Sequence, residues 1–110
     1  MATLTIQNIT LSGLTPSFVS AASGGDEFSN NGRTFIYIKN ANGATARQVT
    51  VTSQTNCNQG FTHDVAVSVP ASSEELIGPF ANSRFNVAGV TSVSYDDETD
   101  LTIAAIQLGA

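Results

Sequence analysis

Short runs in which hydrophobic and polar residues alternate recur along the chain, and little of it shows a helical period. In the clearest run, Asp64 to Val69, three valines share one face while Ala66 and Ser68 occupy the other. A period of two is typical of a strand that buries one face. Pro70 ends this run because proline has no amide proton to donate.

The stretch from Thr34 to Thr55 has the composition of two strands joined by a short turn. β-Branched and aromatic residues, which fit a pleated surface, dominate Phe35 to Ile38 and Val49 to Thr52. The connection from Asn40 to Ala46 is small and contains glycine. The pattern predicts the central antiparallel hairpin of the domain, and the acidic stretch Asp96 to Asp100 is a second predicted hairpin turn.

Further strands are predicted by the same alternation at Thr3 to Gln7, Glu74 to Ile77, Val90 to Tyr95 and Leu101 to Leu108. About seven or eight short strands separated by polar turns are typical of an all-β domain. We therefore expect residues 1–110 to form one domain. Its expected architecture is a single antiparallel β-sandwich, either Ig-like or jelly-roll-like.

The stretch from Ser20 to Gly32 is predicted to be a long loop. It contains adjacent glycines, an acidic pair and an Asn-Gly pair that favours a tight turn. A loop of this length in a compact domain is often functional or flexible. Together with the terminal segment Met1 to Ile6, it is a candidate contact region.

The composition narrows the classes of partner. Hydrophobic residues make up 41% of the chain and charged residues 12%, and the formal net charge is -5. This charge argues against nucleic acid, which proteins bind with clustered lysine and arginine. No hydrophobic run reaches membrane-spanning length, and Met1 to Ile6 lacks the basic and hydrophobic regions of a secretory signal. We expect no nucleic-acid partner, no membrane partner and synthesis in a cytosol.

Side chains that could support catalysis are few and scattered. His63 neighbours Asp64, but adjacent strand residues point to opposite faces, and a nucleophile elbow is absent from the sequence. Cys57 has no nearby cation to lower its thiol pKa. Asp96 to Asp100 could offer oxygen ligands to calcium, yet it lacks EF-hand spacing, so a solvated turn is the favoured interpretation. We expect neither enzymatic activity nor a cofactor.

A series of motifs in the second two-thirds of the chain carries a resemblance to a known group of proteins. In chain order the motifs are Thr34 to Asn40, Val49 to Thr52, Cys57 to Gly60, His63 with Asp64, Val67 to Ala71, Ile77 to Phe80, Phe85 with Asn86, Val93 to Tyr95, and Leu101 to Leu108. Their order and spacing resemble those of small virion proteins of tailed bacteriophages, in particular capsid cement, or decoration, proteins. Proline after the valine strand and Gly-Pro-Phe after the next strand are the most distinctive pieces.

This resemblance implies a mechanical role on the outside of the phage head. Cement proteins bind the major capsid protein, commonly as trimers, and link neighbouring capsomers against the pressure of the genome. The implied localisation is the capsid surface of the virion, after synthesis in the host bacterial cytoplasm. From terminal position and loop length, the expected contacts with the capsid or with other subunits are Met1, Ala2, Thr3, Leu4, Ile6, Gly24, Gly25, Asp26, Glu27 and Phe28.

Two other functions remain open from the sequence. One is a head-to-tail connector or tail accessory protein. The other is a carbohydrate-binding β-sandwich in which Tyr37, Tyr95 and the acidic turn at Asp96 would supply stacking rings and hydroxyl acceptors. The lack of tryptophan weighs against the carbohydrate-binding alternative.

Overall fold

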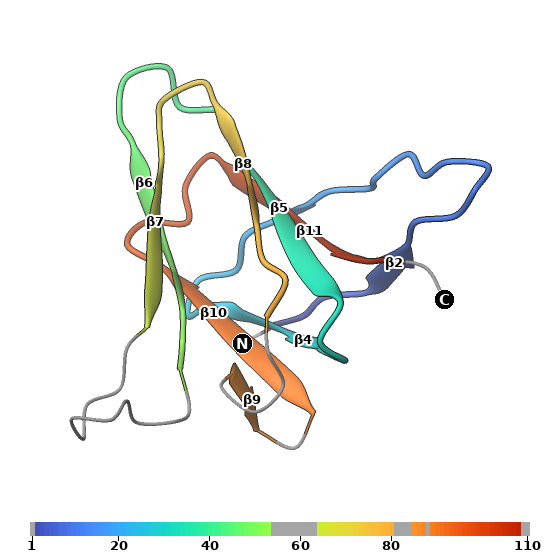
Figure 1. Cartoon of the computed structure of the whole chain (residues 1–110). Coiled ribbons are helices and arrows are strands. Elements are labelled where there is room, and N and C mark those ends of the chain that lie inside the picture. Colours follow the sequence, from blue (N-terminus) through green and yellow to red (C-terminus); the bar gives the residue numbers. More distant parts are fainter. Residues whose placement is uncertain (1, 54–63, 81–84, 88, 109–110) are drawn as a thin grey trace.

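The described residues form two mixed β-sheets packed together, and this confirms the all-β prediction (Figure 1). The computed structural model describes residues 2–53, 64–80, 85–87 and 89–108. The six-stranded sheet has the order β1 (Ala2–Thr3), β4 (Asp26–Ser29), β10 (Val90–Tyr95), β6 (Arg47–Val51) and β7 (Val65–Val69), with β9 (Asn86–Val87) beside β10. The five-stranded sheet has the order β2 (Ile6–Asn8), β11 (Leu101–Gln107), β5 (Thr34–Asn40) and β8 (Glu74–Ile77), with β3 (Val19–Ser20) beside β11.

The sheets contain more strands than the seven or eight expected, and they are not purely antiparallel. Both exceptions lie in the N-terminal segment, where β1 runs parallel to β4 and β2 runs parallel to β11. Between them Leu4 is buried in the core, and its amide donates to the Glu27 carbonyl at 2.7 Å. The segment therefore passes from an edge of one sheet to an edge of the other, and it meets both neighbours in the parallel sense.

The predicted central hairpin is wrong, because its two arms belong to different sheets. β5 pairs along its whole length with β11, whereas β6 pairs with β10 and β7. Residues 41–46 carry the chain over the end of the core from one sheet to the other (Figure 1). Residues 96–100 do the same between β10 and β11, so the second predicted hairpin turn is also a crossing between sheets.

The predicted loop from Ser20 to Gly32 contains the ordered strand β4. Asp26 and Phe28 point into the core and are almost fully buried, while Glu27 points away from it. A tight turn precedes the strand, in which the Gly25 amide donates to the Ala22 carbonyl at 3.0 Å. Pairing with both β1 and β10 makes this polar stretch a strand despite its charged residues.

Alternation places one face of each long strand in the core. The buried hydrophobic side chains come from both sheets and from the segments beside them, and the largest that are fully buried include Phe28, Ile36, Ile38, Leu101 and Ile103. The valine strand β7 behaves as predicted: its three valines face the core and Ala66 and Ser68 are exposed. Burial of apolar surface is the main favourable term in such a fold.

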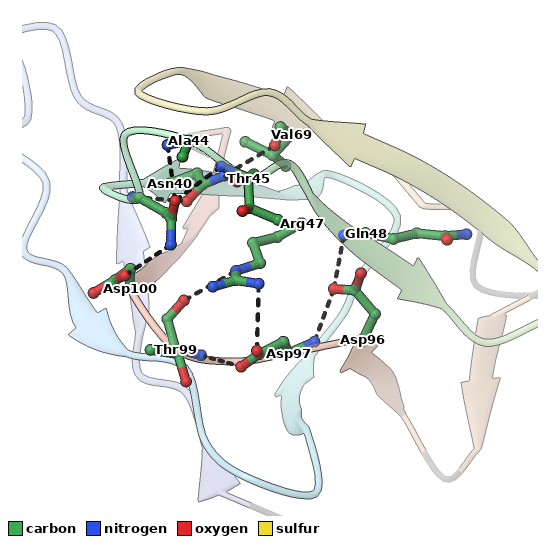
Figure 2. A network of polar contacts seen from close by, with 11 residues as sticks. Asn40, Ala44, Thr45, Arg47, Gln48, Val69, Asp96, Asp97, Thr99 and Asp100 are labelled. Atoms are coloured by element: carbon green, nitrogen blue, oxygen red, sulfur yellow. Dashed lines mark hydrogen bonds and ion pairs between the residues drawn. The ribbon is translucent and has the colours of Figure 1, made fainter.

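The Asn40 side chain forms hydrogen bonds that connect the segment between β5 and β6 to the end of β7 (Figure 2). It is the last residue of β5 and is 2% exposed. Its side-chain amide lies 3.0 Å from the Thr45 carbonyl and 3.1 Å from the Val69 carbonyl, while its backbone amide donates to the Ser73 carbonyl. One side chain thus donates to a carbonyl of the connection between β5 and β6 and to the carbonyl of the last residue of β7, and the second of these bonds is buried.

Replacing Asn40 with alanine should lower the free energy of unfolding by about 1–3 kcal/mol, because it removes a buried hydrogen bond to the Val69 carbonyl and a part-buried one to the Thr45 carbonyl. The matched control is Asn8→Ala, which removes an exposed asparagine at the end of β2. It should change stability by less than about 0.5 kcal/mol. Urea unfolding followed by circular dichroism measures both, and equal losses for the two variants would contradict this role of Asn40.

Candidate functional site

The side of the five-stranded sheet that faces away from the core, called here the outer face, carries two rows of side chains. Along β5 the buried residues alternate with Phe35, Tyr37 and Lys39, which are half-buried and point outward. Strand register places Lys39 between Glu74 of β8 and Thr102 of β11. These three residues form a polar row that crosses three strands.

The next row of the outer face is apolar. Tyr37 lies between Leu76 of β8 and Ala104 of β11. Leu76 is 63% exposed, an unusually open position for a large hydrophobic side chain in this fold. On the outer face, a polar row of side chains therefore lies directly beside a row of aromatic and aliphatic side chains.

Phe18 packs against the outer face from the segment between β2 and β3. Two hydrogen bonds anchor this segment: the side-chain amide of Gln7 donates to the Ser17 carbonyl, and the Ser17 amide donates to the Gln7 side-chain oxygen, both at 2.8 Å. The Phe18 ring then meets the Tyr37 ring edge-on, with centroids 5.0 Å apart. Edge-to-face contact is a favoured geometry for aromatic pairs.

Lys39 and Glu74 lie opposite each other in register, yet each engages an aromatic residue. The Lys39 Nζ lies 4.2 Å from the centroid of the Phe18 ring, within cation–π range. The Tyr37 hydroxyl donates to Glu74 Oε1 at 2.6 Å. This hydrogen bond to a carboxylate, with smaller effects of burial and of the Glu74 charge, raises the pKa of Tyr37. The Tyr37 hydroxyl therefore remains a proton donor at neutral pH.

A shallow depression of about 740 Å³ opens beside the polar row. Its lining includes the whole row and the turn between β7 and β8: Lys39, Asn40, Ala41, Ser72, Ser73, Glu74 and Thr102. The lining offers an ammonium group, a carboxylate and several hydroxyls. Such a surface can exchange hydrogen bonds with a polar ligand.

A smaller groove of about 360 Å³ runs beside the N-terminal segment and β11. It is mainly apolar, and the residues that line it include Leu4, Val19 and Ile103. Val19 is 52% exposed at this edge. The groove marks the place where the N-terminal segment crosses between the sheets.

The structure brings the two predicted contact segments together. Parallel pairing of β1 with β4 sets Ala2 opposite Asp26 and Thr3 opposite Glu27. Ala2, Thr3 and Gly24 are exposed, and Ile6 and Glu27 are half-buried. The remaining described candidates, Leu4, Gly25, Asp26 and Phe28, are buried within the fold, and Met1 lies outside the described residues.

The acidic turn, residues 96–100, is bonded to the first residues of β6 by a network of polar contacts (Figure 2). Asp96 accepts the Gln48 amide at 2.9 Å, and Asp97 lies 3.3 Å from the Arg47 guanidinium. The backbone and hydroxyl of Thr99, helped by the Arg47 charge, lower the pKa of Asp97. Among the described residues, no group of three His, Cys, Asp or Glu side chains is placed to hold a metal ion. His63 and Cys57 lie outside the described residues.

Tyr95 points into the core and not to the surface with Tyr37. Its hydroxyl donates to Asp26 Oδ2 at 2.6 Å, and the Ala22 amide donates to the same oxygen at 3.1 Å. Burial, together with the hydrogen bond to Asp26 and the charge of Asp26, raises the pKa of Tyr95. The other oxygen of Asp26 is buried and has no hydrogen-bond partner among the described residues. Tyr95 therefore supplies the buried carboxylate of Asp26 with a hydrogen-bond donor from within the protein.

Sequence reasoning had identified Tyr37 but missed its neighbours Phe18, Lys39 and Glu74. The alternation of Phe35, Tyr37 and Lys39 with isoleucines was a visible sign that they share a face. The positions of Glu74 and Thr102 beside Lys39 follow from strand register, for which the sequence carries no signal.

Comparisons with protein-family models, with curated proteins and with solved structures find no match to the chain. Within the part of the chain that the structure describes, no helix is long and apolar enough to cross a membrane.

Removing the Tyr95 hydroxyl with Tyr95→Phe should lower the free energy of unfolding by about 1–3 kcal/mol, because Asp26 then loses one of its two donors in a buried site. The matched control is Tyr37→Phe, which removes the same hydroxyl from the outer face and leaves Glu74 free to bind water. Its cost should stay below about 0.5 kcal/mol. A larger loss in Tyr37→Phe than in Tyr95→Phe, measured by urea unfolding, would refute this assignment.

Proposed function

We propose that the protein is a non-enzymatic structural protein of a tailed-phage virion, a cement or decoration protein that binds the outside of the head. Its partner is the major capsid protein, it acts as a homo-oligomer with a trimer favoured, and it resides on the capsid surface. The motif order from Thr34 to Leu108 is the sequence basis of this proposal.

The observation that carries the proposal is the strand order. Setting aside β1, β2 and β9 and keeping the equally short β3, the order is β3-β11-β5-β8 in one sheet and β4-β10-β6-β7 in the other. Every neighbouring pair in these two sets is antiparallel, and the chain switches sheets at nearly every connection. We interpret this order as that of a double-sheet jelly roll, an architecture that viral capsid domains use. A fold does not by itself specify a function, so the surfaces must also suit the role.

The outer side of the six-stranded sheet suits contact with a large protein surface. Register aligns Ser94, Thr50 and Ala66 across three strands, and Gln48 lies opposite Ser68. These central side chains are small or uncharged, and depletion of charge is typical of the centre of protein interfaces. Glu27, which lies opposite Ser92 and Thr3, is a charged residue at the margin of the same face. A standard interface buries about 800 Å² on each partner. The edge where β1 meets β4 continues this surface with the exposed residues Ala2 and Thr3.

Repeated binding explains how such a small protein could strengthen a shell. A protein that binds the assembled shell and not its separated subunits stabilises assembly by mass action. Oligomers that engage several capsomers at once gain further from multivalency. Individually weak contacts at a face with few charges are therefore sufficient.

The alternatives differ in what the structure offers them. A head-to-tail connector or tail accessory protein would use similar surfaces, so only the partner distinguishes it. The carbohydrate-binding alternative, in the form that used Tyr37 and Tyr95 together, loses one ring because Tyr95 points into the core.

Purified protein mixed with undecorated heads should co-sediment with them and saturate at a fixed ratio of protein to capsomers. Thr3→Arg and Thr50→Arg place a large charge on the proposed surface and should weaken binding by about tenfold or more. Thr15→Arg is the matched control, because it places the same charge on an exposed threonine of the segment between β2 and β3.

Failure of the folded protein to co-sediment with heads would overturn the cement proposal. Binding to isolated tails or portals in the same assay would assign the connector function in its place. Equal weakening by Thr15→Arg would move the contact away from the six-stranded sheet.

A further inference from the structure

We propose that the depression at the end of the outer face binds a neutral saccharide. The depression is lined by the polar row Glu74, Lys39 and Thr102 and by the turn residues Ser72 and Ser73. Tyr37 is not part of this lining but lies next to it, where its hydroxyl donates to Glu74. This site lies on the five-stranded sheet, whereas the proposed capsid surface lies on the six-stranded sheet. The saccharide proposal therefore does not depend on capsid binding.

The floor of the depression is a set of groups with regular spacing. Neighbouring strands lie about 4.8 Å apart, so Glu74 and Thr102 lie roughly 10 Å apart with Lys39 between them. The Tyr37 hydroxyl occupies one oxygen of Glu74, and a carboxylate can accept several further hydrogen bonds. The ammonium of Lys39 has three donors, and its contact with the Phe18 ring does not use them all. A ligand with hydroxyls on several sides could pair with all three residues.

The turn between β7 and β8 forms a fixed wall. The Ser72 amide donates to the Asn42 carbonyl at 2.9 Å, and the Ser73 carbonyl accepts the Asn40 amide at 2.9 Å. Ser72 has a φ of 56°, a conformation that side-chain-bearing residues adopt rarely and that these bonds maintain. The two exposed serines thus stand on a backbone that is held by hydrogen bonds within the protein, which lowers the entropy cost of binding. The Ser73 hydroxyl donates to the Ala71 carbonyl at 3.3 Å and can still accept a hydrogen bond from a ligand.

The aromatic side of the site is also fixed. Phe18 meets Tyr37 edge-on, and the Tyr37 hydroxyl is held by Glu74. Binding sites for small molecules typically combine aromatic surface with a few well-placed polar groups. The C–H groups of a pyranose ring can pack on an aromatic side chain while its hydroxyls meet the polar row.

The lining has no net charge. It contains one cation, Lys39, and one carboxylate, Glu74, so its formal charge is zero. The attraction of either charge for an ionic ligand is offset by the repulsion of the other, so the lining gives no net advantage to an anion or a cation. An apolar ligand would leave the hydroxyls of Ser72, Ser73 and Thr102 without partners. A neutral compound with many hydroxyls is the class that meets each of these constraints.

The test is a titration of the ¹⁵N-labelled full chain with glucose, galactose, mannose and N-acetylglucosamine, each as a monosaccharide and as a tetrasaccharide. We expect saturable shifts of the amide signals of Lys39, Ser73, Glu74 and Thr102 with at least one of these sugars. Glu74→Gln should weaken that binding by about tenfold, because it removes a charged acceptor. Glu75→Gln is the matched control on the same strand, since Glu75 pairs with Ile38 on the other face of the sheet, and it should leave binding within about twofold.

A second pair of variants tests the ring. Tyr37→Ala should abolish binding, whereas Phe35→Ala, two residues away on the same face, should retain it. The proposal is overturned if none of these sugars shifts the four signals, if shifts arise elsewhere on the chain, or if Glu74→Gln and Glu75→Gln weaken binding equally. Tighter binding of glucuronic acid or of inorganic phosphate at the same residues would overturn the neutral ligand class.

Discussion

The side chain of Asn40 is the contact on which the arrangement of this molecule most depends. It lies where β5 ends and the chain leaves one sheet for the other, and it is buried there among carbonyls of two connections. Buried polar groups that find all their partners make a structure rigid and specify a single arrangement. At this crossing the chain leaves the five-stranded sheet, so β5 and β6 lie in different sheets and do not form a hairpin.

The same constraint determines which residues reach the surface. Because β5 lies between β8 and β11, its outward side chains acquire neighbours from both, and Lys39 and Tyr37 become the centres of two rows. The turn of Ser72 and Ser73 reaches this place because it is bonded to the residues around Asn40. The centre of the opposite sheet presents small, uncharged side chains, with Glu27 at its margin. The two sheets thus carry a surface with few charges, which we propose for the capsid, and a polar depression, which we propose for a sugar.

The sequence was sufficient for the all-β class and for most strands, because alternation is a local property that each strand carries by itself. It was misleading wherever the outcome depended on distant residues. The run around Asp26 looked like a loop, since the tyrosine that stabilises this buried carboxylate is 69 residues away along the chain. Alternation in β5 and β6 showed that each buries one face, but it could not show that the two faces meet across the core. The parallel pairing that joins the two predicted contact segments had no local signal either.

The most direct test of this account is a measurement of backbone nuclear Overhauser effects between strands in solution. The account predicts that Tyr37 of β5 contacts both Ala104 and Leu76. It also predicts that Thr50 of β6 contacts both Ser94 and Ala66. These contacts occupy both edges of each strand and so place β5 and β6 in different sheets. Contacts that pair the backbone of Ile38 with that of Val49, as a direct hairpin between β5 and β6 would produce, would contradict it.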